Sequence, residues 1–84
     1  MSKIEKLIDR FYKVPIPNDI TYEEIEKLAN YFGCIVKKNS GRHSLHIAYP
    51  QLGIVIPIPV HGKEVKEAYI KQLKELFDMI REEN

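Results

Sequence analysis

The 84-residue chain has a single cysteine, only four glycines and no long run of apolar residues. A lone cysteine, Cys34, cannot form a disulfide within the chain, and its place between Gly33 and Ile35 is typical of a small buried side chain. The opening residues, Met-Ser-Lys-Ile-Glu-Lys, are too charged for a secretory signal or a membrane span. We therefore expect a cytoplasmic protein with no membrane association.

Several patterns that indicate catalysis are also missing. The scattered glycines form no phosphate-binding loop, and the sequence has neither a supported Ser-His-Asp pattern nor paired catalytic carboxylates. His43 and His46 are three residues apart on one predicted strand, so they face opposite sides and are poorly placed to share a zinc ion. Glu64 is the one carboxylate near the histidines in the sequence. We expect neither a metal nor any small-molecule cofactor.

The remaining composition is that of one small globular domain covering residues 1–84, with 44% hydrophobic and 30% charged residues. Residues 37–74 carry a net charge of +5, whereas residues 1–36 carry −1 and residues 75–84 carry −3. All three histidines lie in the basic part. This charge distribution favours a polyanionic partner, although a solvated lysine face would look the same.

Two capping boxes predict where helices begin. Ser2 with Glu5 precedes an apolar stripe and predicts a helix over about 2–12, and Thr21 with Glu24 predicts a second over about 22–32, ended by Gly33. The Pro-rich segment between them separates the two helices. A third apolar stripe predicts a long helix from about residue 62 to residue 80.

Between the second and third helices the apolar period changes to two residues, which predicts strands at 34–38, 43–49 and 54–59. Pro57 and Pro59 cannot donate a backbone hydrogen bond, so the last strand should lie at the sheet edge. The order α-α-β-β-β-α predicts a two-layer α+β domain, with a three-stranded antiparallel sheet and its helices on one face. The open face should carry Ser44, His46 and Ala48.

The histidines are the residues best suited to chemistry. His43 follows Ser40-Gly41-Arg42 at a turn, where it is exposed to a ligand and beside a cation. An imidazole in basic surroundings suits cleavage of RNA, because it can accept the proton of a ribose 2′-hydroxyl while cations hold the phosphate. His46 and His61 are weaker candidates when considered alone, since each could be an ordinary surface residue.

Two short motifs carry a resemblance to a known family. Gly41-Arg42-His43, the strand after it, the run from Ile56 to Glu64 and the helix that follows Tyr69 together resemble the HicA family of toxin mRNA interferases. The resemblance covers about residues 21–80, so residues 1–20 would be an N-terminal helical extension. The chain departs from the family pattern at Arg42, where serine is usual, and at His46, where an aromatic residue is usual.

The resemblance implies a fold like that of a double-stranded-RNA-binding domain (dsRBD). It also implies metal-independent cleavage of mRNA, with His43 as the catalytic base, and neutralisation by a HicB-like antitoxin protein. His61 matches a second family position and is the preferred general acid, ahead of His46 and Tyr49. We expect the RNA phosphates to meet five basic residues: Lys37, Lys38, Arg42, Lys63 and Lys66. A non-catalytic RNA-binding module and a protein-interaction domain are the alternatives.

Overall fold

The computed structural model of the chain describes residues 3–38, 44–60 and 62–83. Within these residues the order is α-α-β-β-β-α, which confirms the predicted α+β fold class. The elements are α1 (Lys3–Phe11), α2 (Tyr22–Tyr31), β1 (Ile35–Lys38), β2 (Ser44–Tyr49), β3 (Ile54–Pro59) and α3 (Glu67–Glu83), with a short 3-10 turn at Pro50–Leu52. No helix of the described part is long and apolar enough to cross a membrane.

The three strands form one antiparallel sheet with the order β1-β2-β3. Burial along β2 alternates residue by residue, so Leu45, Ile47 and Tyr49 face the core and the intervening side chains face outward. Gly53, with a φ of 64°, takes the left-handed conformation that closes the turn between β2 and β3. The prolines are in β3, at the edge of the sheet, as their missing N–H groups predicted.

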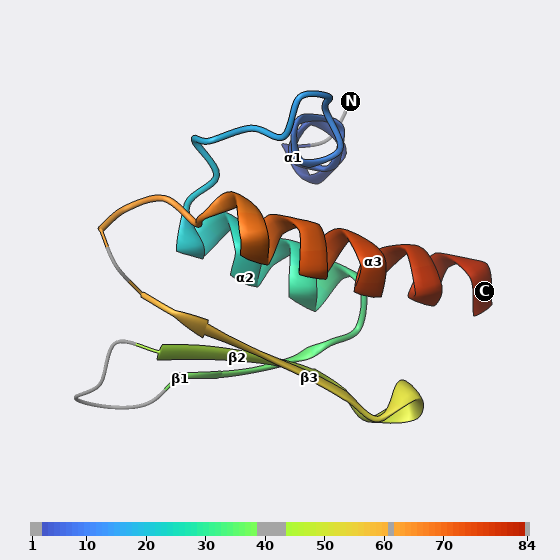
Figure 1. The fold of residues 1–84 in the computed structure, drawn as a ribbon. Helices are drawn as coiled ribbons and strands as arrows, with labels where there is room; N and C mark the ends of the chain where they lie inside the picture. The colour runs from blue at the N-terminus through green and yellow to red at the C-terminus, as the bar shows by residue number, and fades with distance from the viewer. Residues whose placement is uncertain (1–2, 39–43, 61, 84) are drawn as a thin grey trace.

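All three helices lie on one side of the sheet (Figure 1). Helices α2 and α3 run side by side over it, and α1 crosses them on the side away from the strands (Figure 1). The core between these elements is entirely apolar, because no polar or charged residue is buried among the described residues. Its largest fully buried side chains are Phe11, Ile20, Ile25, Leu28, Ile47, Ile58, Ile70, Leu73, Leu76 and Phe77.

The ends of α2 follow the signals in the sequence. The Thr21 side chain accepts a hydrogen bond from the Glu24 backbone N–H at 3.2 Å, and the Glu24 carboxylate accepts from the Thr21 backbone N–H at 3.0 Å. This is the predicted capping box. At the other end Gly33 has a φ of 82°, and the Cys34 N–H donates to the Ala29 carbonyl at 2.8 Å. A left-handed glycine therefore ends the helix and directs the chain into β1.

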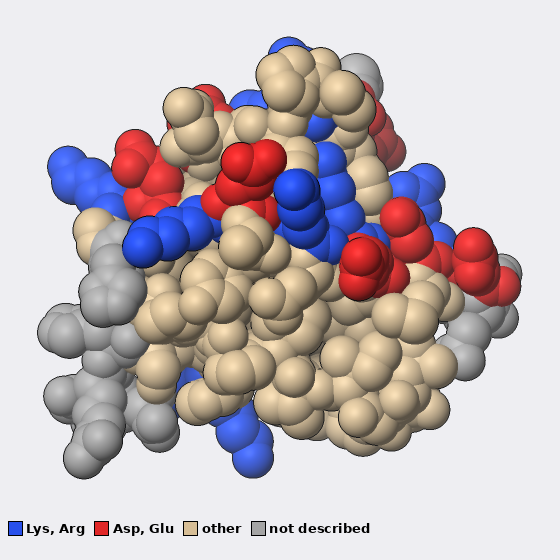
Figure 2. Space-filling view, in the orientation of Figure 1, with Lys and Arg blue, Asp and Glu red and all other residues tan. Residues whose placement is uncertain are grey.

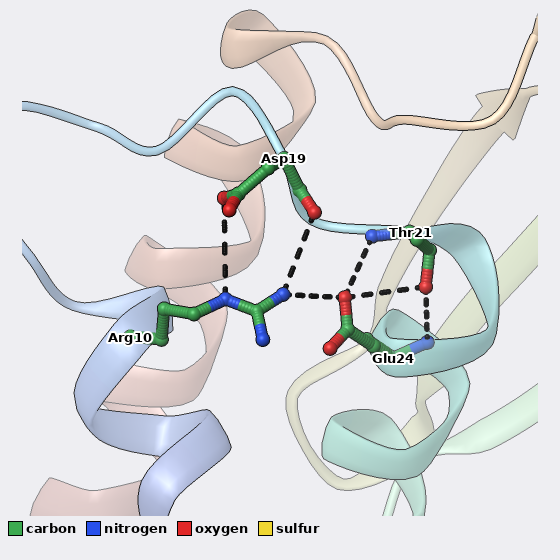
Figure 3. Close-up of polar contacts among 4 residues, drawn as sticks. All are labelled: Arg10, Asp19, Thr21 and Glu24. Atoms are coloured by element: carbon green, nitrogen blue, oxygen red, sulfur yellow. Dashed lines mark hydrogen bonds and ion pairs between the residues drawn. The ribbon is translucent and has the colours of Figure 1, made fainter.

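Helix α1 belongs to the same core as the rest of the domain. Leu7 and Phe11 are buried, and the Phe11 ring lies 5.5 Å from the Phe77 ring of α3, centroid to centroid. Arg10 extends from α1 to α2, where its Nη2 lies 2.6 Å from Oε1 of Glu24 (Figure 3). The apolar stripe of α1 thus packs against the chain's own helices. Ser2, the expected cap of α1, lies outside the described residues.

The third helix begins later than its sequence predicts. Its first residue is Glu67, because the preceding residues are extended and pair with the segment before α2. Val65 donates its N–H to the Ile20 carbonyl at 2.8 Å, and Glu64 forms a bridge with Thr21. The Lys66 carbonyl then accepts the first helical hydrogen bonds. This pairing joins the start of α3 to the start of α2.

Candidate functional site

The sheet end where β2 begins and β3 ends is the candidate functional site. His43, Arg42 and His61, which the sequence singled out here, lie outside the described residues. The structure does place their neighbours, since Ser44 pairs with Pro59 in the antiparallel register. The flanks of the two motifs are therefore adjacent across the sheet, an arrangement that a His43–His61 pair would require.

Tyr22 reaches this sheet end from the first turn of α2. Its hydroxyl donates to the Pro59 carbonyl at 3.2 Å. Beside it is a hollow of about 340 Å³, lined by Thr21, Tyr22, Glu23, Gly62 and Lys63. Tyr22 could not be identified from the sequence, because only its position after the Thr21 cap marks it locally and its contact with β3 forms on folding. A phenol and a lysine amine thus border the space next to the candidate histidine positions.

The open face of the sheet places a histidine next to a lysine. His46 in β2 pairs with Lys37 in β1 and with Pro57 in β3, so these three residues form one row across the sheet. His46 is half-buried, and Lys37 is exposed. The next row is apolar and consists of Ile35, Ala48 and Val55. Among the described residues of this face, Lys37 is the only cation, so the face is largely uncharged.

Four of the five expected phosphate-binding residues are described, and these four do not share one surface. Lys38 faces away from Lys37, toward α2, and its Nζ lies 2.8 Å from Oε1 of Glu26. The hydrogen bond to Glu26 raises the pKa of Lys38. Lys63 and Lys66 are both exposed in the segment before α3, and Lys63 lines the hollow beside Tyr22. The structure therefore separates Lys63 and Lys66 from Lys37. It also pairs Lys38 with Glu26 of the same chain, at the surface.

Two of the three residues considered as general acids lie apart from the sheet end at Ser44. Tyr49 is at the opposite end of β2, paired with Ile54, and only 8% of its surface is exposed. His46 is on the open face, two residues beyond Ser44. His61, the third, is outside the described residues. The placement of Tyr49 in the core leaves the two histidines as the candidates.

The other reactive side chain of the described residues, the Cys34 thiol, packs in the core. The thiol of Cys34 is buried, and this burial raises its pKa to about 11, which keeps it protonated at neutral pH. Among residues 3–38, 44–60 and 62–83, no three His, Cys, Asp or Glu side chains are grouped so as to hold a metal ion.

The element order α-β-β-β-α from α2 to α3 and the helices on one sheet face define a small two-layer α+β domain. Comparisons with protein-family models, with curated proteins and with solved structures find no match for this chain. Its function must therefore be argued from its own residues.

Proposed function

We propose that the chain is a metal-independent endoribonuclease that cleaves mRNA, a toxin of the HicA type. The observation that supports this proposal is the pairing of Ser44 with Pro59, which brings together the flanks of the two histidine motifs. The dsRBD-like order of elements and the exposed Lys63 and Lys66 near the same sheet end are consistent with it. A HicB-like antitoxin protein would neutralise the toxin by covering this end.

In the proposed reaction His43 accepts the proton of a ribose 2′-hydroxyl. The 2′-oxygen then forms a bond to the adjacent phosphorus while the bond from phosphorus to the 5′-oxygen breaks. His61 gives a proton to the departing 5′-oxygen, so the products are a 2′,3′-cyclic phosphate and a free 5′-hydroxyl. Lys63 and Lys66 offset the negative charge of the phosphate during the step. The chain supplies every proton transfer, and the reaction needs no metal.

The test is incubation of the purified chain with a mixed single-stranded RNA in the presence of EDTA, with fragment lengths read on a gel. Wild type should cleave, and His43→Ala should leave the RNA intact while keeping the circular dichroism spectrum of the wild type. Equal cleavage by both proteins would refute the role of His43. Intact RNA with both, but with salt-sensitive RNA binding, would instead favour an RNA-binding module of the same fold.

A further inference from the structure

A groove of about 510 Å³ lies between α1 and α2 and has a strongly basic lining. Four cations surround it against one carboxylate, and two aliphatic side chains of α1 complete the lining. The cations are Lys3, Lys6, Arg10 and Lys27, the carboxylate is that of Glu24, and the aliphatic side chains are those of Ile4 and Leu7. Figure 2 shows the charged side chains of this view gathered over the helical part of the molecule, while the part below it is mostly uncharged.

The basic lining follows from how α1 distributes its charges. Residues three, four and seven apart share one side of a helix, so Lys3, Lys6 and Arg10 form a single stripe that faces α2. The acidic residues of α1, Glu5 and Asp9, do not line the groove, although Asp9 is three residues from Lys6 and flanks the stripe. The helix therefore presents one charge sign to the groove.

Arg10 is already neutralised, whereas the lysines are not. The guanidinium of Arg10 contacts the Glu24 carboxylate at 2.6 Å and the Asp19 carboxylate at 3.9 Å (Figure 3). The ion pairs found among the described residues include none of the three groove lysines. Like charges this close oppose one another, so an anion in the groove would relieve their repulsion.

The groove lysines suit an anion rich in oxygen atoms. Lysine binds phosphate as a compact point charge, and the planar arginine fork can bind either a phosphate or a carboxylate. The one arginine of the groove is occupied by Glu24 and Asp19, which leaves only lysines for a ligand. The two α1 lysines left for a ligand, Lys3 and Lys6, are about 4.5 Å apart along the helix axis, close enough to contact adjacent phosphates of one strand.

We propose that the groove between α1 and α2 binds the phosphate backbone of RNA. The identity of the occupant rests on the proposed ribonuclease function. The groove and the candidate site are joined by α2, because Tyr22 borders the hollow at the sheet end and Lys27 borders the groove, about 8 Å further along the helix. An RNA that reaches both would pass around α2, because five residues turn the helix through about 140° and Tyr22 contacts β3 while Lys27 faces α1. Helix α1, which lies outside the HicA-like segment, supplies most of this second contact.

The test compares two double variants that remove the same charge. Lys6→Gln with Lys27→Gln alters the groove, and Lys13→Gln with Lys71→Gln removes two exposed lysines elsewhere. Both are made in a His43→Ala background, so that the RNA stays intact, and binding of a fluorescein-labelled single-stranded RNA is followed by anisotropy between about 50 and 200 mM salt. At the lowest salt the groove variant should bind the RNA about tenfold or more weakly than the control variant. Its slope of log K against log salt should be shallower than that of the control by about 1.4.

The groove is not an RNA site if the two double variants have equal affinities and equal slopes, or if the parent protein binds no RNA. Circular dichroism should show that both variants are folded. The unfolding midpoint of the groove variant should be no lower than that of the parent protein, because the groove variant loses like-charge repulsion. RNA cleavage by the His43-containing chain is measured separately. If the chain cleaves RNA but the two variants have equal salt slopes, only the proposed groove site is refuted. If RNA binding depends on the groove lysines but the chain does not cleave RNA, only the proposed nuclease activity is refuted.

Discussion

Replacing Phe11 by alanine should test whether α1 is an integral part of the domain. The Phe11 side chain is fully buried. Its ring meets that of Tyr12 edge-on at 5.3 Å and that of Phe77 at 5.5 Å, centroid to centroid. Phe77 in turn stacks at 4.5 Å on Phe32, the residue that caps the end of α2. Phe11 is thus the point at which α1 joins an aromatic cluster shared by all three helices.

The expected loss is large relative to the stability of so small a domain. Burying a phenylalanine removes about 150 to 250 Å² from water, and measured Phe→Ala changes in cores cost about 3 to 5 kcal/mol. A chain of this length has a free energy of unfolding of about 4 to 13 kcal/mol. Phe11→Ala should therefore remove about a quarter or more of the total and lower the melting temperature by roughly 12 °C or more.

Urea unfolding followed by circular dichroism at 222 nm measures the change. Val14→Ala is the matched control, because Val14 lies three residues away, is 92% exposed and should change stability by less than about 0.5 kcal/mol. A loss below about 1 kcal/mol for Phe11→Ala would refute the reasoning. The residues from 21 onward would then fold without help from α1, which would be an appendage.

Two further predictions concern ionisation. Desolvation opposes the charge on Glu24, but hydrogen bonds from Arg10 and Thr21 outweigh it and lower the pKa of Glu24 below its ordinary 4.5. Its stabilising effect is therefore complete above about pH 4.5 and lost as the pH falls through the lowered pKa. The free energy of unfolding measured in urea from pH 6 down to pH 2 should fall less steeply for Glu24→Gln than for wild type, and equal slopes would contradict this. Burial raises the pKa of Cys34 from 9.0 to about 11, so iodoacetamide should modify the native chain about a hundredfold more slowly at pH 8 than the urea-unfolded chain. Equal rates, read by mass spectrometry, would show that the thiol is accessible.

Features fixed by neighbouring residues could be predicted from the sequence. The change of apolar period near Cys34 placed the boundary between helix and strand, and Thr21 with Glu24 marked the start of α2 correctly. Gly33 and the two prolines of β3 were equally informative, since each acts through the backbone at its own position. The fold class follows from these local signals and their order.

Features made by distant pairings could not be predicted in this way. The late start of α3 depends on Glu64 and Val65 pairing with residues before α2. The contact between Tyr22 and Pro59 and the ion pair between Lys38 and Glu26 likewise join separate elements. The charge along the chain predicts that Lys37 and Lys38 both contact the same RNA. Strand alternation and the ion pair of Lys38 with Glu26 instead place the two side chains on opposite faces of the sheet.

The two prolines of β3 also bear on how copies of the chain can associate. Strand β1, at the other side of the sheet, carries no proline over Ile35–Lys38, so its outer edge keeps more backbone donors for an additional strand than the edge of β3, which lacks those of Pro57 and Pro59. If two copies joined through β1, a third copy could add only at a β3 edge, where two prolines weaken strand pairing. Association by strand addition would thus favour a closed pair over a fibre.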